Sequence, residues 1–229
     1  MEDLFIWYCT LPRRGKGVPQ HGDTWIREKF SYGKEIEGLN YEWVNYDYLE
    51  HGFPPMDTKL LLPDELYFII QRQKKLVFDF LPYRKNLFII SEKFKFFIET
   101  HLSDKPLEFA RLKVVHKNNK EFLNEKKYYL LRVILFDDDL FDFIEEGKKR
   151  AAGLRGEFIY PSLILKNDVR QEIFFLDSFC YQESILFTGK IKDIIKAQFF
   201  RPEIYKIEDF YLAFNNNSTS RSEHLPAIV

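Results

Sequence analysis

The chain has 229 residues, of which 45% are hydrophobic and 30% charged, and its 34 Lys and Arg nearly balance its 35 Asp and Glu. This composition excludes a disordered or collagen-like chain, because the apolar surface is large enough to offset the entropy cost of ordering. Generic nucleic-acid binders carry a basic excess that this chain lacks. Aromatic residues make up 17% of the chain, enough for a large core and for exposed rings of the kind that anchor protein interfaces.

The N-terminal segment predicts a buried strand from Leu4 to Leu11, ended by Pro12. Acidic residues precede it where an export signal needs basic ones, and the apolar run is too short to span a membrane. The two cysteines, Cys9 and Cys180, lie far apart in the sequence, which fits a reducing compartment rather than a disulfide framework. We therefore expect a soluble, cytoplasmic protein with no membrane partner.

The remainder of the first 75 residues is predicted to be rich in strands. A basic, glycine-rich segment at 13–23 is either a solvated loop or an anion site, although it lacks the spacing of a phosphate-binding loop. Rings alternate with polar residues at 39–48, which predicts a half-buried strand, and a turn follows at 52–55. The segment from Leu66 to Ile70 fits either a strand or part of a short helix that begins near Pro63.

An internal match gives the clearest view of the fold. Residues 76–115 align without a gap on residues 173–212, and each copy is predicted to form strand, strand, helix and strand. Ser91 and Thr188 stand at the N-cap positions, where a hydroxyl accepts from the first backbone N–H groups of the helix. Apolar residues then recur at helical spacing, and a proline follows each helix. The copies predict pseudo-repeated halves of a single α+β domain over residues 1–214, with a mixed or antiparallel sheet and a few helices.

Between the copies, residues 126–136 predict a strand, and the acidic segment at 137–146 predicts a helix that starts near Asp138. Leu140, Phe141 and Ile144 would face inward on that helix. A further strand is predicted at 160–165. The low-complexity residues beyond Phe214 predict a flexible tail over 215–229.

The acidic segment is the best candidate binding site in the sequence. Adjacent aspartates are suitable ligands for Mg²⁺ or Ca²⁺, but the glycine of a calcium loop is missing, and we expect no metal site. Acids at a helix N-terminus are also ordinary stabilising residues. The third interpretation is a docking face for a basic partner, because complementary charge speeds encounter and fixes register. Its partner-binding residues would be Asp137, Asp138, Asp139, Asp142, Glu145 and Glu146.

The sequence carries no signature of catalysis. Its five histidines are dispersed, and it has neither a Gly-x-Ser-x-Gly elbow nor a dinucleotide fingerprint. Cys180 lies between apolar runs, as a buried hydrophobic residue would, although a Cys–His pair that meets only in space stays open. The basic residues from Arg111 to Lys127, beside tyrosines at 128–129, have the composition of a single-strand binding surface. Two glutamates interrupt them, which favours a solvated hairpin. We expect no catalytic residue, no cofactor and no nucleic-acid partner.

The strand Tyr128–Val133 followed by an aspartate-rich turn, together with the apolar strand and capped helix at 185–195, resembles immunity proteins of bacterial polymorphic toxin systems. The likeness covers residues 76–212. It implies a cytoplasmic α+β protein that binds and neutralises one cognate toxin domain without catalysis. The alternatives are an enzyme with a dispersed active site and a scaffold protein that self-associates through its surplus aromatic residues.

Overall fold

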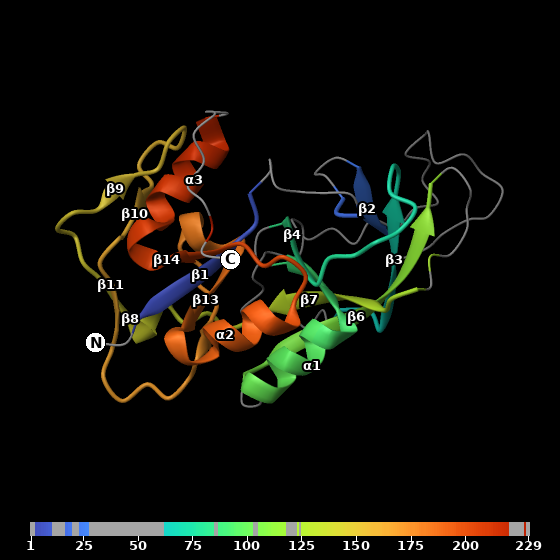
Figure 1. Ribbon diagram of the computed structural model, residues 1–229, viewed down its shortest axis with the longest axis horizontal. Helices are drawn as coiled ribbons and strands as arrows, with labels where there is room; N and C mark the ends of the chain where they lie inside the picture. The colour runs from blue at the N-terminus through green and yellow to red at the C-terminus, as the bar shows by residue number, and fades with distance from the viewer. Residues whose placement is uncertain are drawn as a thin grey trace. The chain divides into compact units, whose positions relative to one another are not determined.

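The structure is a computed structural model that describes residues 3–10, 17–19, 23–27, 62–84, 87–102, 105–117, 123, 125–219 and 227. The strand expected at 39–48, the turn at 52–55 and most of the loop at 13–23 lie outside these residues. Mixed and antiparallel sheets combine with helices, so the predicted α+β class is confirmed (Figure 1). Backbone contacts group the chain into two compact units, one formed by residues 1–13, 98–105 and 135–229 and the other by 14–97 and 106–134. We call them unit 1 and unit 2.

Unit 2 contains a sheet of six strands in the order β2-β3-β6-β7-β5-β4. All neighbours are antiparallel except β3 and β6, which are parallel. The segment that fitted either helix or strand forms β3, because its side chains alternate between the two faces of the sheet. Its Leu66, Phe68 and Ile70 are buried in one core with residues of β6 and β7. The strands are β2 (Thr24–Arg27), β3 (Glu65–Ile70), β4 (Phe80–Arg84), β5 (Leu87–Ser91), β6 (Leu107–His116) and β7 (Tyr128–Val133).

The core just described lies on one face of this sheet. Helix α1 (Glu92–His101) packs on the other face, at the end formed by β4 and β5. The Phe94 ring lies 5.5 Å from that of Phe80, measured between centroids. Ser91 caps the helix as predicted, because its hydroxyl accepts from the Phe94 N–H at 3.2 Å. The same hydroxyl donates to a carboxylate oxygen of Asp79 at 2.7 Å. This bridge ties the start of the helix to the residue before β4.

Unit 1 is built on an antiparallel sheet in the order β12-β13-β1-β14. Helix α2 (Gly189–Gln198) packs on one face, where the Trp7 ring meets that of Phe199, just after the helix, at 5.8 Å. Helix α3 (Phe210–Thr219) packs on the other face, where Phe210 meets Tyr8 edge-on at 5.3 Å. The alternation of β1 therefore fills a core on each side. The strands are β1 (Leu4–Tyr8), β12 (Ile173–Phe174), β13 (Ser184–Thr188) and β14 (Ile204–Lys206).

Two small ribbons complete unit 1, one formed by β8 (Phe141–Phe143) with β11 (Leu163–Leu165) and the other by β9 (Lys149–Arg150) with β10 (Phe158–Ile159). The helix predicted from Asp138 is wrong. Asp138–Leu140 forms a single 3₁₀ turn, and the chain continues directly into β8. The reason lies in the alternation of β8, in which Phe141 is buried against Phe174 while the next residue, Asp142, is exposed.

The two predicted halves share one order of elements and one sheet topology. In unit 2 the hairpin β4–β5 is followed by α1 and then β6, and β7 lies between β5 and β6. In unit 1, β12 and β13 are followed by α2 and then β14, and β1 lies between β13 and β14. A duplication as the origin of this likeness, and a single domain over residues 1–214, remain predictions. The caps differ, because the Thr188 hydroxyl makes no capping hydrogen bond.

Helix α3 corrects the predicted tail over 215–229, because residues 215–219 belong to this helix. Two amides hold that part of the chain. Asn215 accepts from the Ala152 N–H at 2.8 Å and donates to the Arg150 carbonyl, while Asn217 donates to the Tyr8 hydroxyl at 2.8 Å. Low complexity in the sequence concealed these long-range hydrogen bonds.

Candidate functional site

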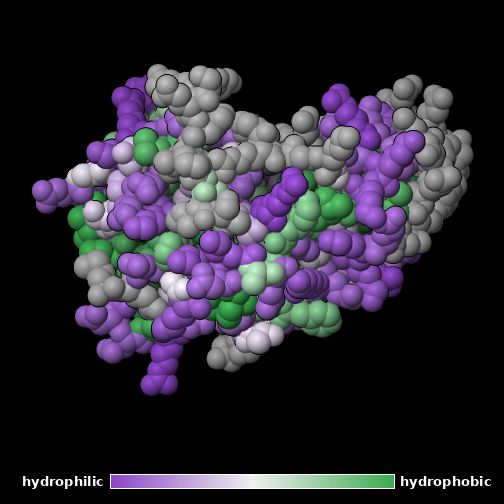
Figure 2. Space-filling view, in the orientation of Figure 1, coloured by the Kyte–Doolittle hydropathy of each residue, from purple (hydrophilic) through white to green (hydrophobic). Residues whose placement is uncertain are grey.

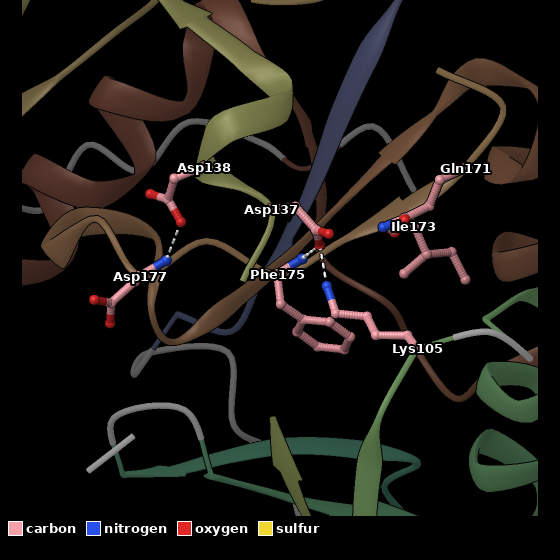
Figure 3. Close-up of polar contacts among 7 residues, drawn as sticks. All are labelled: Lys105, Asp137, Asp138, Gln171, Ile173, Phe175 and Asp177. Carbon is pink, nitrogen blue, oxygen red and sulfur yellow. Dashed lines mark hydrogen bonds and ion pairs between the residues drawn. The ribbon is translucent and has the colours of Figure 1, made fainter. Parts of the chain in front are cut away.

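Asp137, the first residue of the predicted acidic site, forms a buried ion pair with Lys105 (Figure 3). The two side chains are only 7% and 5% exposed. The Asp137 carboxylate also accepts from the Phe175 N–H at 2.8 Å, and the backbone N–H of Asp137 donates to the Phe175 carbonyl at 2.9 Å. This carboxylate therefore joins the segment after β7 to the end of β12 and to the loop that carries Lys105.

Burial lowers the pKa of Lys105, and the carboxylate of Asp137 opposes that shift by charge and by hydrogen bonding. The ammonium also lies 5.6 Å from the centre of the Phe175 ring, within the range of a cation–π contact. Removing either charge would leave its buried partner uncompensated, which is the costly case for an ion pair. The pair consequently has a structural role, and Asp137 is not available to a partner protein.

Asp138 is also held inside unit 1, by two backbone donors from the chain after β12. Its carboxylate oxygens accept from the Asp177 N–H at 2.7 Å and from the Ser178 N–H at 3.0 Å. Burial raises the pKa of Asp138, while these two hydrogen bonds act in the opposite direction. Figure 3 shows Asp138 beside Asp177 and Asp137 aimed at Lys105.

The other four predicted site residues, Asp139, Asp142, Glu145 and Glu146, are exposed. Asp142 lies 3.9 Å from the Lys166 ammonium, and Lys166 also donates to the Asp139 carbonyl at 2.7 Å. Glu145 pairs with Lys148, which lowers the pKa of the glutamate, and accepts from the Tyr160 hydroxyl. The structure thus splits the predicted site into one buried and one half-buried structural aspartate and four surface acids, some of them beside lysines.

Two open pockets lie in unit 1. The smaller, of about 320 Å³, adjoins the buried ion pair, and its lining includes His101, Leu135 and Arg170. The larger, of about 760 Å³, lies along the turn from Pro161 to Val169. Neither pocket contains Cys180, which is buried in the core, and burial raises the pKa of its thiol to about 12. Such a thiol is a poor nucleophile near neutral pH, because the reactive form is the thiolate.

The residues that the structure describes contain no group of three or more His, Cys, Asp or Glu side chains placed to hold a metal ion. Among the same residues, no helix has the length and apolar character needed to cross a bilayer. Large hydrophobic side chains do reach the surface, which is otherwise dominated by hydrophilic residues in the view of Figure 2. The exposed ones are Phe96, Leu135, Phe179, Ile194 and Phe200.

The basic stretch noted in the sequence is divided between the two faces of the unit 2 sheet. Arg111, Lys113 and Lys117 alternate with the buried residues of β6, whereas Tyr128 faces the core and donates to the Phe78 carbonyl at 3.1 Å. Tyr129 lies on the face opposite Tyr128. The aromatic side chains that β2 and β3 add to that face could not be predicted from the sequence, because they come from distant parts of the chain.

An α+β protein with charged and aromatic surface segments has the features of a protein-binding module. Comparison with family models makes the assignment specific: the model of the Immunity protein 43 family matches residues 10–219. The chain therefore belongs to the Immunity protein 43 family, which confirms the resemblance seen in the sequence. No curated protein matches the chain in sequence.

Proposed function

We propose that this protein is an immunity protein that binds one cognate toxin domain in the cytoplasm and blocks it without catalysis. The observation that carries the proposal is the match to the Immunity protein 43 family, which extends over most of both compact units.

We propose that the exposed acids of the predicted site make the contact on unit 1. Asp139, Asp142, Glu145 and Glu146 are exposed at the 3₁₀ turn, in β8 and just after it. Acidic residues at an interface rim raise the association rate with a basic partner and fix its orientation. Asp137 and Asp138 are left out of this contact because their carboxylates bind residues of the chain itself.

The experiment begins with tagged protein recovered from its native host together with any partner. The partner is expressed alone and with this chain, and growth is followed. A partner that stops growth alone and is tolerated in the presence of this chain supports the proposal. If this chain does not restore growth to cells that express a toxic partner, immunity by direct binding is contradicted.

The site is then tested with the purified toxin domain. Charge reversal at Asp139, Asp142 and Glu146 should slow association by about tenfold at low salt, and the loss should fade as salt is added. Reversal of the exposed acids Glu183, Asp193 and Glu208 is the matched control, since it changes the net charge equally at other places on unit 1. Equal association rates for both triple variants would show that these acids are not part of the interface.

A further inference from the structure

One face of the unit 2 sheet carries a layer of aromatic and cationic side chains, which we call the cation–aromatic face. The alternation of β3 and β6 places Leu66, Phe68, Leu112 and Val114 in the core, so the residues between them point to the other side. The face comprises the rings of Trp25, Tyr67, Phe109 and Tyr129 and the cations Arg27, Lys95, Arg111, Lys113 and Lys117.

Pairing between strands places these residues in rows. Arg27 of β2 is opposite Tyr67 of β3, and Tyr67 is opposite Lys113 of β6. In the next row Arg111 lies between Glu65 of β3 and Tyr129 of β7. Because β3 and β6 are parallel, residues from widely separated parts of the sequence form one continuous surface.

Most of the cations on this face lie over a ring. The Lys117 ammonium is 5.2 Å from the centre of the Trp25 ring, and that of Lys113 is 5.5 Å from Tyr67. Lys95 extends from α1 to within 4.9 Å of Phe109 and 5.4 Å of Tyr129. Cation–π contacts of this kind hold flexible side chains in place, so these ammonium groups are ordered before a partner arrives and lose less entropy on binding.

The layer is accessible and strongly positive. Arg111 is exposed, the Lys113 side chain is 38% exposed, and the four rings are partly exposed. Ile69 and Val115, which lie on the same face, are buried, so rings and cations make up most of its accessible surface, together with Glu65 and Leu107. On β2, β3 and β6 the acid of this face is Glu65, which pairs with Lys113, and at the α1 end Glu92 pairs with Lys127. The cations of the face thus outnumber its acids in a chain whose formal net charge is −1.

We propose that the cation–aromatic face is a contact surface for an acidic surface of the cognate toxin domain. This inference rests on the proposed immunity function and names the chemistry of a second contact, carried by unit 2. Tyrosine, tryptophan and arginine are the residues enriched at interface hot spots. An acidic surface supplies the complementary charge, and its carboxylates bind arginine and lysine by charge-assisted hydrogen bonds.

The arrangement favours an acidic protein over a nucleic acid. Single-stranded nucleic acid binds through bases stacked on open ring faces inside a basic groove. Here lysine ammonium groups lie over rings of all four aromatic residues, so those ring faces are shared with cations of the same chain. What reaches a partner is a layer of positive charge supported by rings.

The test compares two triple variants of the full chain. Arg111→Gln, Lys113→Gln and Lys117→Gln neutralise the face while keeping long side chains. Arg72→Gln, Lys74→Gln and Lys75→Gln are the matched control, because these three residues are also exposed in unit 2 but lie between β3 and β4. Association and dissociation of the purified toxin domain are measured at two salt concentrations. We expect the face variant to bind about tenfold more weakly at low salt and the control to match the wild type.

Three further measurements distinguish failure of this inference from failure of the proposed immunity function. Tyr67→Ala should also weaken toxin binding, because it removes the ring under Lys113. A fluorescent glutamate-rich peptide should bind the wild type and the control but not the face variant, whatever the toxin result. Unchanged toxin binding or unchanged peptide binding by the face variant overturns the inference. Tighter binding of oligothymidylate than of the peptide, lost in the face variant, would also overturn it. Failure of the wild type to protect cells contradicts the proposed function instead, and the peptide result then still decides the chemistry of the face.

Discussion

Replacing Asp137 by asparagine tests the structural role assigned to the buried ion pair. The side chains of Asp137 and Lys105 are 7% and 5% exposed. Removing one partner of a buried ion pair lowers the free energy of unfolding by about 3–5 kcal/mol. The loss for Asp137→Asn should lie near the lower end, about 3 kcal/mol near neutral pH, because the asparagine oxygen can still accept from the Phe175 N–H.

The same variant should recover stability as the pH rises. Burial already lowers the pKa of Lys105, and the variant removes the carboxylate that opposes this shift. Between the folded-state pKa and the ordinary value of 10.5, the unfolded chain binds more protons than the folded one, so stability increases with pH. A difference of one bound proton between the two states changes the free energy of unfolding by about 1.4 kcal/mol per pH unit. The deficit should therefore shrink between about pH 7 and about pH 9, by at most about 2.8 kcal/mol, the limit for one proton over two pH units.

The assay is denaturant unfolding of the wild type, Asp137→Asn and Lys105→Met at both pH values. Asp139→Asn is the control, because this neighbouring aspartate is exposed, and it should change stability by less than about 0.5 kcal/mol. Lys105→Met should lose about 3–5 kcal/mol and should not show the recovery, because it has no lysine to titrate. A loss below about 1 kcal/mol in both pair variants, or a constant deficit for Asp137→Asn, would refute the reasoning.

Three other predictions concern the helix caps and the buried cysteine. Ser91→Ala should lower the free energy of unfolding by about 1–2 kcal/mol, because it removes the cap of α1 and the donor to Asp79; a neutral result in denaturant unfolding would contradict this. Thr188→Val should increase the free energy of unfolding by about 1 kcal/mol and so raise the melting temperature, because the buried Thr188 hydroxyl has no hydrogen-bond partner among the described residues. A lower melting temperature would show that the hydroxyl is bonded. In the folded protein near pH 8 Cys180 should resist iodoacetamide, since burial raises its pKa to about 12, and mass spectrometry should find it labelled only after unfolding.

The sequence was informative wherever local pattern and tertiary structure agree. The two strand–helix copies were predicted because apolar spacing and capping residues are local signals, and Ser91 forms the expected cap. Thr188 stands at the same position without a capping bond, which the residue type alone does not reveal. The strand β3 was ambiguous in the sequence and was settled by pairing with β6.

The acidic segment shows why the rest was beyond prediction. Its charge order matched a helix dipole, but Asp137 and Asp138 bind Phe175, Asp177 and Ser178, which follow them by 38 to 40 residues. Those partners are brought near by the sheet of unit 1 rather than by local structure. The cation–aromatic face was hidden for the same reason, because its rows cross strands that are distant in the chain.

The most direct test of immunity by binding is a titration of the purified toxin domain with this protein, with the activity of the toxin measured in its own assay. If the chain neutralises its toxin by forming a complex, activity should fall linearly and disappear at one equivalent. Inactivation of many toxin molecules by one molecule of this protein would reveal catalysis, and full activity at a large excess would rule out neutralisation. Either of these two results would contradict the proposed function.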